Sequence, residues 1–316
     1  MSTALADPLE LQRHAPIPTW FHIGGRADAF ARPTSHDQLA DLLRRDPSLR
    51  ILGDGANLLV HDEGVADTVV SLAAPAFSGW QIDARTGIVR AGAGANLPKL
   101  IHATIREGLA GLEVLGGVPA SLGGALVMNA GGAFGQIADV VRSVTALARD
   151  GSTVHLTRQQ IAFAYRSSGL EGLIITGCEL ALTPADPAPL RERLLDIMAK
   201  KKASQPLAAH SAGCVWKNPT LPHDHPALGP AGARVSAGMV IDRAGLKGLA
   251  VGGASISPVH ANFVVTDTAV ATAQHVIDLM IETRRRVFDT FGVTLHPEVV
   301  IWRRRSLGLD PAGVAP

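Results

Sequence analysis

The sequence predicts an α+β fold. Segments typical of strands and segments typical of helices are mixed along the 316 residues without strict β-α-β-α alternation, which disfavours a doubly wound parallel sheet. No G-x-G-x-x-G motif joins a strand to a helix, so a Rossmann cofactor site is not supported. The chain length suggests about two domains with real cores.

Composition disfavours several classes of protein. The net charge of +1 implies no strong attraction to nucleic acid or membrane surfaces. The first residues contain no apolar stretch of signal-peptide length, and no run approaches the roughly 18 apolar residues of a spanning helix. The two cysteines, Cys178 and Cys214, have no metal-ligand spacing. We therefore expect a cytoplasmic protein with reduced thiols, no metal and no obligate protein partner.

Local signals predict two helices in the first half. Residues 35–46 begin with Ser35 and place Gln38 three residues later, which is a capping-box pattern. A second helix follows Asn96, a residue type that caps helix N-termini, and ends at Gly108.

Turn residues predict a hairpin and a domain boundary. The pair Asp150-Gly151 lies between two apolar runs and predicts a type I′ turn. A later apolar run predicts a strand that carries Cys178. Three prolines within residues 183–189 break the pattern, and we place a domain boundary there.

The second half begins with a helix that includes residues 190–202. A long amphipathic helix is predicted at about residues 268–291. Its expected core-facing residues are Val270, Ala273, Val276, Ile277, Met280, Ile281, Val287 and Phe288.

Two glycine-rich segments, residues 53–59 and 116–132, have the composition of phosphate-binding loops. Glycine lets successive backbone N–H groups converge on an anion. Ser121 adds a hydroxyl donor, and Asn57 and Asn129 can bond a ring amide or fix the loops. Neither segment ends in the G-K-[ST] of a P-loop, which disfavours nucleotide hydrolysis. Each segment alone is more often a structural turn, but together they favour a dinucleotide-like cofactor.

The order of several segments resembles the UDP-N-acetylenolpyruvoylglucosamine reductase family, flavoproteins of peptidoglycan precursor synthesis. These segments cover about residues 17–302. They read TWFHIGGRADAF, LGDGANLLV, GGVPASLGGALVMNAGG, AYRSSG, SAGCVWKNP, SAGMVIDRAGLKG, VHANFVV and GVTLHPEV.

The resemblance implies a vanillyl-alcohol-oxidase-type (PCMH-type) FAD-binding fold of two subdomains, followed by a C-terminal α+β domain that binds substrate. The short spacing between Arg166 and Lys200 is similar to the shorter form of the family, which lacks a tyrosine loop. The implied division is an N-terminal extension at 1–15, the FAD-binding domain at 16–186, the substrate-binding domain at 190–304 and a tail at 305–316.

The resemblance also implies the reaction and its cofactor. The family uses NADPH and FAD to reduce UDP-N-acetylglucosamine enolpyruvate to UDP-N-acetylmuramate. Ala56 and Ala120 replace a serine and a glycine common in the family, and Trp216 replaces a phenylalanine. The implied FAD-binding residues are Gly53, Asp54, Gly55, Ala56, Asn57, Leu58, Gly117, Val118, Pro119, Ala120, Ser121, Gly123, Gly124, Asn129, Ala130 and Gly131.

Three residues match the catalytic positions of the family. Arg166 would face the substrate carboxylate, and a guanidinium suits a carboxylate that becomes an enolate. Cys214 occupies the position of a serine proton donor, and a thiol of ordinary pKa still carries its proton at neutral pH. Glu298 would either be protonated and donate a hydrogen bond, or orient Arg166 and the donor, since an ionised carboxylate would repel an enolate. Both roles stay open.

Tyr165, Lys217 and Asn218 are implied to bind the substrate or NADPH, although Lys217 taken alone would more often be a solvated surface residue. His223 and His225 have ligand-like spacing but no nearby third donor, so we do not expect a metal site. Two other functions remain in view. One is a flavin oxidase with the same cofactor fold, and the other is a non-catalytic module that binds the UDP-sugar.

Overall fold

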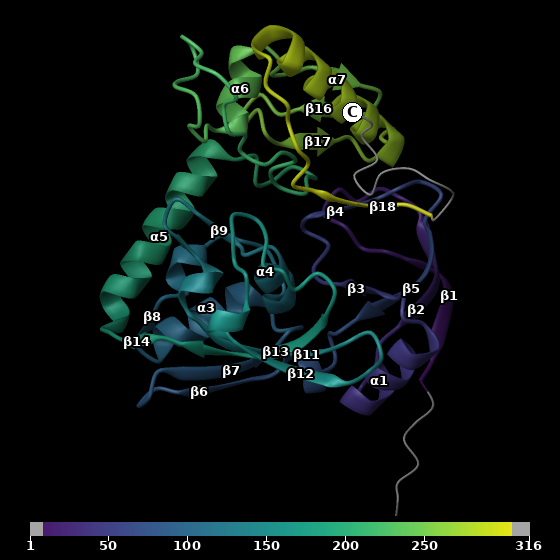
Figure 1. Cartoon of the computed structure of the whole chain (residues 1–316), viewed down its shortest axis with the longest axis vertical. Helices are drawn as coiled ribbons and strands as arrows, with labels where there is room; N and C mark the ends of the chain where they lie inside the picture. Colours follow the sequence, from purple (N-terminus) through teal and green to yellow (C-terminus); the bar gives the residue numbers. More distant parts are fainter. Residues whose placement is uncertain (1–8, 305–316) are drawn as a thin grey trace, which may run out of the picture. The chain divides into compact units, whose positions relative to one another are not determined.

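The computed structural model describes residues 9–304, which form two compact units (Figure 1). The first unit contains the described residues up to Ala15, together with Ala27–Asp54 and Ala66–Met198. The second contains Pro16–Arg26, Gly55–Val65 and the described residues from Ala199 onward. The chain crosses from the first unit to the second for the last time within helix α5 (Pro187–Ser204). This crossing lies a little beyond the predicted boundary at 183–189. The division into FAD-binding and substrate-binding domains stays a prediction, and the predicted tail lies outside the described residues.

The first unit is built on a five-stranded antiparallel sheet and a four-stranded sheet. In spatial order, the larger sheet consists of β12 (Thr153–Thr157), β11 (Val141–Leu147), β13 (Ile174–Ala181), β7 (Ile88–Gly92) and β6 (Trp80–Asp83). The smaller sheet consists of β1 (Leu11–Pro16), β2 (Arg26–Ala31), β5 (Val65–Ser71) and β3 (Arg50–Leu52). Two short pairs add β8 (Leu109–Ala110) with β14 (Thr183–Pro184), and β9 (Gly131–Gly132) with β10 (Gly135–Gln136).

Helices α3 and α4 lie over one face of the larger sheet (Figure 1). They share a core with both sheets, and this core includes Leu97, Leu100, Leu122, Val144 and Leu180. The α-helices of the unit are α1 (His36–Arg45), α2 (Pro75–Ser78), α3 (Leu97–Arg106), α4 (Leu122–Val127) and the first part of α5. Short 3-10 turns occur at Glu113–Leu115, Ile137–Asp139 and Arg158–Gln160.

Both predicted helix caps in this unit are confirmed. The Ser35 hydroxyl accepts a hydrogen bond from the Gln38 N–H at the start of α1, and Asn96 accepts one from the Lys99 N–H at the start of α3. These caps were predictable because each satisfies a backbone donor only three residues away.

The hairpin between β11 and β12 is confirmed, but the predicted type I′ turn is wrong. Such a turn needs positive φ at two residues, whereas here Gly151 alone has positive φ, at 84°. The Ala148 N–H bonds the Ser152 carbonyl, which leaves three residues in the loop. The Asp150 carboxylate accepts bonds from the N–H and hydroxyl of Ser152, an arrangement that favours an Asx turn.

The second unit packs helices against a three-stranded sheet (Figure 1). The sheet contains β15 (Ala250–Val251), β16 (Ala254–Ile256) and β17 (Val264–Thr266). Helices α6 (Ala237–Arg243) and α7 (Ala273–Phe291) share its core, where Trp216 is among the largest fully buried side chains. A separate parallel pair joins β4 (Leu58–Val60) to β18 (Val300–Trp302).

Helix α7 confirms the predicted long helix, with a later start and a different buried face. It begins after the cap Thr272, and the Asp62 carboxylate accepts hydrogen bonds from the N–H groups of Ala273 and Gln274. The predicted core residues Ala273, Val276, Ile277, Met280 and Val287 are buried.

Three of the residues predicted for the α7 core are exposed, so their assignment was wrong. Val270 precedes the helix, while Ile281 and Phe288 lie beside the buried stripe on its solvent-facing side. The stripe is instead completed by Leu279, Thr283 and Phe291. The amphipathic period identified the helix, but the width of its buried face is set by the sheet against which it packs.

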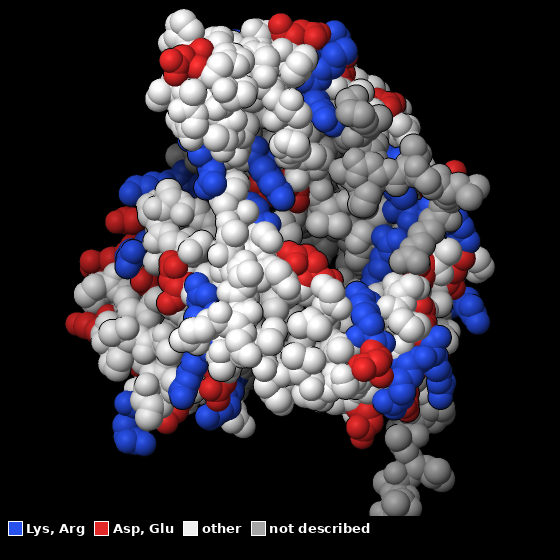
Figure 2. Space-filling view, in the orientation of Figure 1, with Lys and Arg blue, Asp and Glu red and all other residues white. Residues whose placement is uncertain are grey.

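The described surface carries charges of both signs. On the face seen in Figure 2, Lys and Arg are interspersed with Asp and Glu on each unit. Among residues 9–304, none of the helices combines the length and apolar character required to cross a bilayer.

The two cysteines differ in their surroundings. Cys178 lies in β13 and is buried, and burial raises the pKa of its thiol to about 12, with Glu179 adding to the shift. Cys214 is only half-buried.

We expect iodoacetamide at mildly alkaline pH to modify Cys214 in the native protein and both cysteines after unfolding, because the thiolate is the reactive form. Intact-mass and peptide mass spectrometry measure this, with Cys214→Ser as the control. Equal labelling of Cys178 in the folded protein would contradict the packing of β13.

Candidate active site

Gly53 and Ser121, which come from the two glycine-rich segments, lie side by side in the first unit. A Cβ atom on Gly53 would lie 2.6 Å from the Ser121 Oγ, which is closer than real side chains approach. The Ser121 hydroxyl also caps α4 by accepting a hydrogen bond from the Gly124 N–H at 3.3 Å. The two segments therefore meet closely, and a side chain at position 53 would require the Ser121 hydroxyl to move from its capping position.

Backbone hydrogen bonds fix the segment around Ser121. The Leu97 N–H bonds the Ala120 carbonyl, and the Gly123 N–H bonds the Ala93 carbonyl. Ala120, which replaces a glycine of the family, is half-buried and packs against the core.

Asn129 is a buried scaffold residue in the structure. Its side-chain Nδ2 donates to the Gln136 Oε1 at 3.0 Å and to the Ala164 carbonyl at 2.9 Å. Its Oδ1 accepts from the Ala138 N–H at 3.3 Å. Asn129 thereby ties the glycine segment to the residue that precedes Tyr165. A direct cofactor contact by Asn129 stays a prediction.

Arg166 lies at a tight turn in a backbone conformation that side chains rarely adopt. Ala164 and Ser167 exchange backbone hydrogen bonds of 2.9 and 3.2 Å, so Tyr165 and Arg166 form the turn between them. Arg166 has a φ of 55°, a left-handed value that favours glycine or asparagine. Its guanidinium carbon lies 5.2 Å from the centre of the Tyr165 ring.

The turn is anchored from both sides, which explains how it tolerates the strain. Asn129 holds the Ala164 carbonyl, and the fully buried Ser168 hydroxyl donates to the Val127 carbonyl at 2.8 Å. Strained residues persist where surrounding structure fixes them, and they are concentrated at functional sites. The half-buried Arg166 therefore presents a cation at a defined position of the first unit.

In the second unit, Cys214 lies on a strand-like segment with a hydrogen-bonded neighbour on each side. On one side, Cys214 pairs with Phe263, and the Val215 N–H donates to the Asn262 carbonyl at 2.9 Å. On the other side, the Glu298 N–H donates to the Val215 carbonyl at 2.8 Å. Cys214 and Glu298 therefore belong to adjacent, hydrogen-bonded segments of the second unit.

Asn57 holds the same region from the glycine segment. Its side-chain Nδ2 donates to the Glu298 carbonyl at 3.1 Å, and its own carbonyl accepts from the Val300 N–H at 3.0 Å. These bonds continue directly into the parallel pairing of β4 with β18. Asn57 was predicted from the sequence to bind a ring amide or to fix a loop. Its hydrogen bond to the Glu298 carbonyl was not predicted.

The residues after Cys214 are fixed by their main chains. The Lys217 N–H donates to the His296 carbonyl at 2.9 Å. The Asn218 Oδ1 accepts from the Ala237 N–H at 3.0 Å, which joins this segment to the start of α6. The roles predicted for Lys217 and Asn218 in ligand binding stay predictions. His225 packs edge-on against Phe291 with ring centres 5.2 Å apart.

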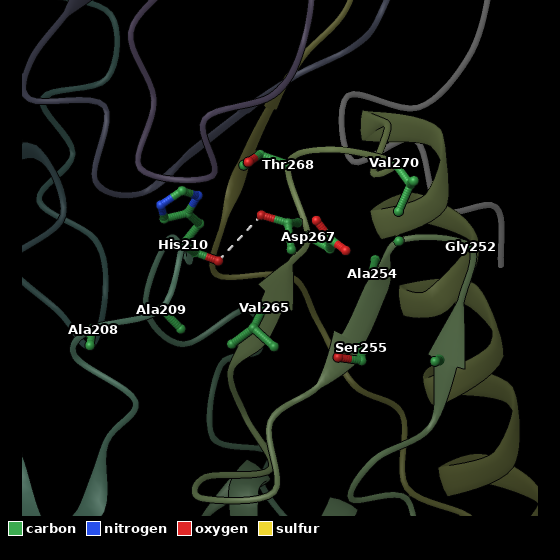
Figure 3. Close-up of a pocket in the computed structure, with 13 residues that line it drawn as sticks. Ala208, Ala209, His210, Gly252, Ala254, Ser255, Val265, Asp267, Thr268 and Val270 are labelled. Atoms are coloured by element: carbon green, nitrogen blue, oxygen red, sulfur yellow. Dashed lines mark hydrogen bonds between the residues drawn. The ribbon is translucent and has the colours of Figure 1, made fainter.

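A pocket of about 640 Å³ lies elsewhere in the second unit (Figure 3). His210 and Asp267 are among its lining residues, and the dashed line in Figure 3 marks the hydrogen bond that the Thr266 hydroxyl donates to the His210 carbonyl at 3.4 Å. The His210 ring stacks on His22 at 4.3 Å between ring centres. None of the residues predicted to be catalytic lines this pocket. Its lining comprises Ala208, Ala209, His210, Ala250, Gly252, Gly253, Ala254, Ser255, Val265, Thr266, Asp267, Thr268 and Val270.

Asn262 is a buried residue of this region that was not among the predicted site residues. It occurs in VHANFVV, one of the segments that carry the family resemblance. Its side chain makes two hydrogen bonds to the backbone of Trp216, 46 residues away. A buried asparagine beside a phenylalanine could have suggested a bonded amide, but its partner could not be read from the sequence.

The close approach of Gly53 and Ser121 is compatible with the predicted site for the FAD phosphates, which stays a prediction. In such a site, the Gly53 backbone and the Ser121 hydroxyl would lie against the phosphates. Asp54 directly follows Gly53, and partial burial of its loop raises the pKa of its carboxyl. Four of the implied FAD residues, Gly55, Ala56, Asn57 and Leu58, belong to the second unit, and the others belong to the first.

Comparison with known proteins identifies both halves of the chain. Residues 27–157 match the family model described as an FAD binding domain. Residues 205–302 match the model for the C-terminal domain of UDP-N-acetylenolpyruvoylglucosamine reductase. The two matched stretches do not overlap.

Relatives match over nearly the whole chain. UDP-N-acetylenolpyruvoylglucosamine reductase 2 of Symbiobacterium thermophilum is 39% identical over 310 residues, covering 96% of this chain and 95% of the relative. The reductase of Rhodospirillum rubrum is 40% identical over 301 residues, covering 94% and 89%. The crystal structure of the Thermus caldophilus reductase matches with a TM-score of 0.76 and 34% identity, covering 93% of this chain and 99% of that chain.

These matches confirm the predicted FAD-binding α+β fold and the predicted class of enzyme. Identity of this level over almost the full length of both proteins goes well beyond a shared cofactor domain. The chain belongs to the UDP-N-acetylenolpyruvoylglucosamine reductase family of FAD-dependent oxidoreductases.

Proposed function

We propose that this chain reduces UDP-N-acetylglucosamine enolpyruvate to UDP-N-acetylmuramate, with FAD as cofactor and NADPH as electron donor. The observation that carries the proposal is the hydrogen-bonded arrangement of the second unit, in which Glu298, Val215 and Asn57 are joined. It brings the segment of the proposed proton donor beside the proposed acidic residue, next to a glycine segment assigned to FAD.

The chemistry requires one hydride and one proton. When bound, FAD reduced by NADPH supplies the hydride that adds to the β-carbon of the enol ether. The carbon–carbon double bond is lost, and negative charge spreads from the α-carbon into the substrate carboxylate. A proton on the α-carbon then completes the lactyl ether.

Arg166, Cys214 and Glu298 carry the protein's part of this step in our proposal. The Arg166 guanidinium pairs with the substrate carboxylate and stabilises the developing enolate. The Cys214 Sγ–H donates its proton to the α-carbon. Glu298 either donates a hydrogen bond in its protonated form or orients Arg166 and the donor, and its main chain lies beside Val215.

The remaining assignments follow the same proposal. Tyr165, Lys217 and Asn218 bind the substrate or NADPH, and Lys217 suits a diphosphate because its ammonium is a mobile point charge. Residues 16–186 bind FAD, and residues 190–304 bind substrate. The enzyme acts in the cytoplasm in peptidoglycan synthesis, which supports cell-wall growth, cell shape and division, without a metal or an obligate protein partner.

An anaerobic absorbance trace tests the function. We expect purified protein to be yellow, to bleach on addition of NADPH, and to regain its flavin absorption when the enolpyruvyl sugar follows. Rapid recovery in air without the sugar would favour a flavin oxidase instead. Tight binding of the sugar by protein that consumes no NADPH would favour a binding module. Protein that cannot be loaded with FAD would rule out the proposal.

Variants at Cys214 test the proton donor. Cys214→Ser should retain substantial turnover, because a hydroxyl also carries a transferable proton. Cys214→Ala should lose about 100-fold or more in the reoxidation of flavin by the sugar, while flavin reduction by NADPH remains. Stopped-flow absorbance separates the two steps. If a thiol is the donor, the rate of reoxidation should fall as the pH rises through the pKa of that thiol. This fall should be absent in Cys214→Ser. Normal turnover by the alanine variant would exclude Cys214 as the donor.

Arg166→Gly separates strain from catalysis. Glycine relieves the positive φ at this turn, so we expect the melting temperature to stay within a few degrees of the parent or to rise. Loss of the cation should slow flavin reoxidation by the sugar by about 100-fold or more. Calorimetry and stopped-flow absorbance measure the two effects, and Arg166→Lys is the control that retains charge without the planar fork. A destabilised Arg166→Gly variant with unchanged reoxidation would show that this arginine is structural.

A further inference from the structure

Asn262 binds the backbone of Trp216 with both ends of its side-chain amide. Its Oδ1 accepts from the Trp216 N–H at 2.9 Å, and its Nδ2 donates to the Trp216 carbonyl at 2.8 Å. Its own carbonyl accepts from the Val215 N–H at 2.9 Å. One residue, only 2% exposed, thus makes three hydrogen bonds to two consecutive residues of the segment that carries Cys214.

The chemistry of the contact is specific to an amide. A primary amide offers one donor face and one acceptor face, which match the carbonyl and N–H of the Trp216 main chain. An aspartate of nearly the same shape keeps the acceptor and sets a second oxygen against the Trp216 carbonyl. Because the site is buried, the unmatched groups cannot turn to water.

Asn262 is itself held in a compact turn. Its N–H donates to the His260 Nδ1 at 3.2 Å, and the Phe263 N–H donates to the His260 carbonyl at 2.9 Å. Burial lowers the pKa of His260, which favours the neutral ring whose Nδ1 can accept. The Ser257 N–H donates to the Phe263 carbonyl at 2.8 Å and closes the turn.

The segment that Asn262 holds has little freedom on its other side. The Val215 carbonyl accepts from the Glu298 N–H, and the Lys217 N–H donates to the His296 carbonyl. Cys214 directly precedes the stretch from Val215 to Lys217, which is hydrogen-bonded on both sides. It follows Gly213, which has a φ of 76°. The hydrogen bonds that hold the stretch from Val215 to Lys217 therefore limit how far the backbone of Cys214, and with it the sulfur, can move.

We propose that Asn262 is a positioning residue that fixes the register and direction of the Cys214 segment, so that the thiol delivers its proton to one face of the substrate α-carbon. The proposal rests on the proposed function for the role of the thiol. Asn262 acts through Trp216 and Val215, without contact to substrate.

The experiment compares Asn262→Asp and Asn262→Ala with the parent and with Thr283→Val. Thr283 is a suitable control because it is also buried in the second unit, and its hydroxyl donates within α7 to the Leu279 carbonyl at 2.7 Å. Thr283→Val removes one buried hydrogen bond without altering any group that bonds the Cys214 segment. All measurements are made on FAD-loaded protein well below the melting temperature of each variant.

Three readouts separate positioning from general stability. Flavin reduction by NADPH should stay within about twofold of the parent in both Asn262 variants, while reoxidation by the enolpyruvyl sugar should slow by about 10- to 100-fold. NMR of the product should show both configurations at the α-carbon, because solvent protonates an enolate that the thiol no longer reaches. The Thr283→Val control should give parental reoxidation and a single configuration.

Alkylation of Cys214 provides a readout that needs no turnover. A loosened segment should increase its rate of iodoacetamide modification by about tenfold in both Asn262 variants, and Thr283→Val should leave it unchanged. Parental reoxidation, a single product configuration or an unchanged alkylation rate in Asn262→Ala would overturn the proposal. So would equal losses in Thr283→Val. If the parent itself fails to transfer electrons to the sugar, the proposed function fails, while the alkylation rates still decide whether Asn262 fixes the thiol.

Discussion

The second unit depends on the peptide hydrogen bonds on either side of Val215. Its N–H is bonded to Asn262 and its carbonyl to Glu298, so main-chain hydrogen bonds and isolated β-bridges join three segments that are distant in sequence. Because both bonds are made by main-chain atoms, the register between the segments decides which side chains are neighbours. This register places Cys214 and Glu298 on adjacent segments, and the Asn57 amide extends the same network into a glycine segment.

In the first unit, the Arg166 cation is fixed by a strained backbone turn. Arg166 occupies a left-handed backbone conformation that a glycine would adopt without strain. The cost is tolerated because buried hydrogen bonds from Asn129 and Ser168 hold the turn and its surroundings. An arginine at such a position costs local stability, and strain of this kind is concentrated at functional sites.

Local features were predictable from sequence because their partners lie within a few residues. The caps Ser35 and Asn96 are examples, and the family resemblance supplied the fold and the candidate residues. The outer residues Ile281 and Phe288 were misassigned because the buried width of a helix depends on the surface against which it packs. The role of Asn262 was beyond reach for the same reason, since its partner Trp216 is brought near only by tertiary folding.

Hydrogen exchange of individual amides tests the central claim most directly. If the segment is held from both sides, the N–H groups of Val215, Trp216 and Glu298 should exchange only when the second unit unfolds, with opening free energies equal to those of the buried turns of α7. Exchange of these amides at the rate of an exposed loop, while α7 remains protected, would contradict the account.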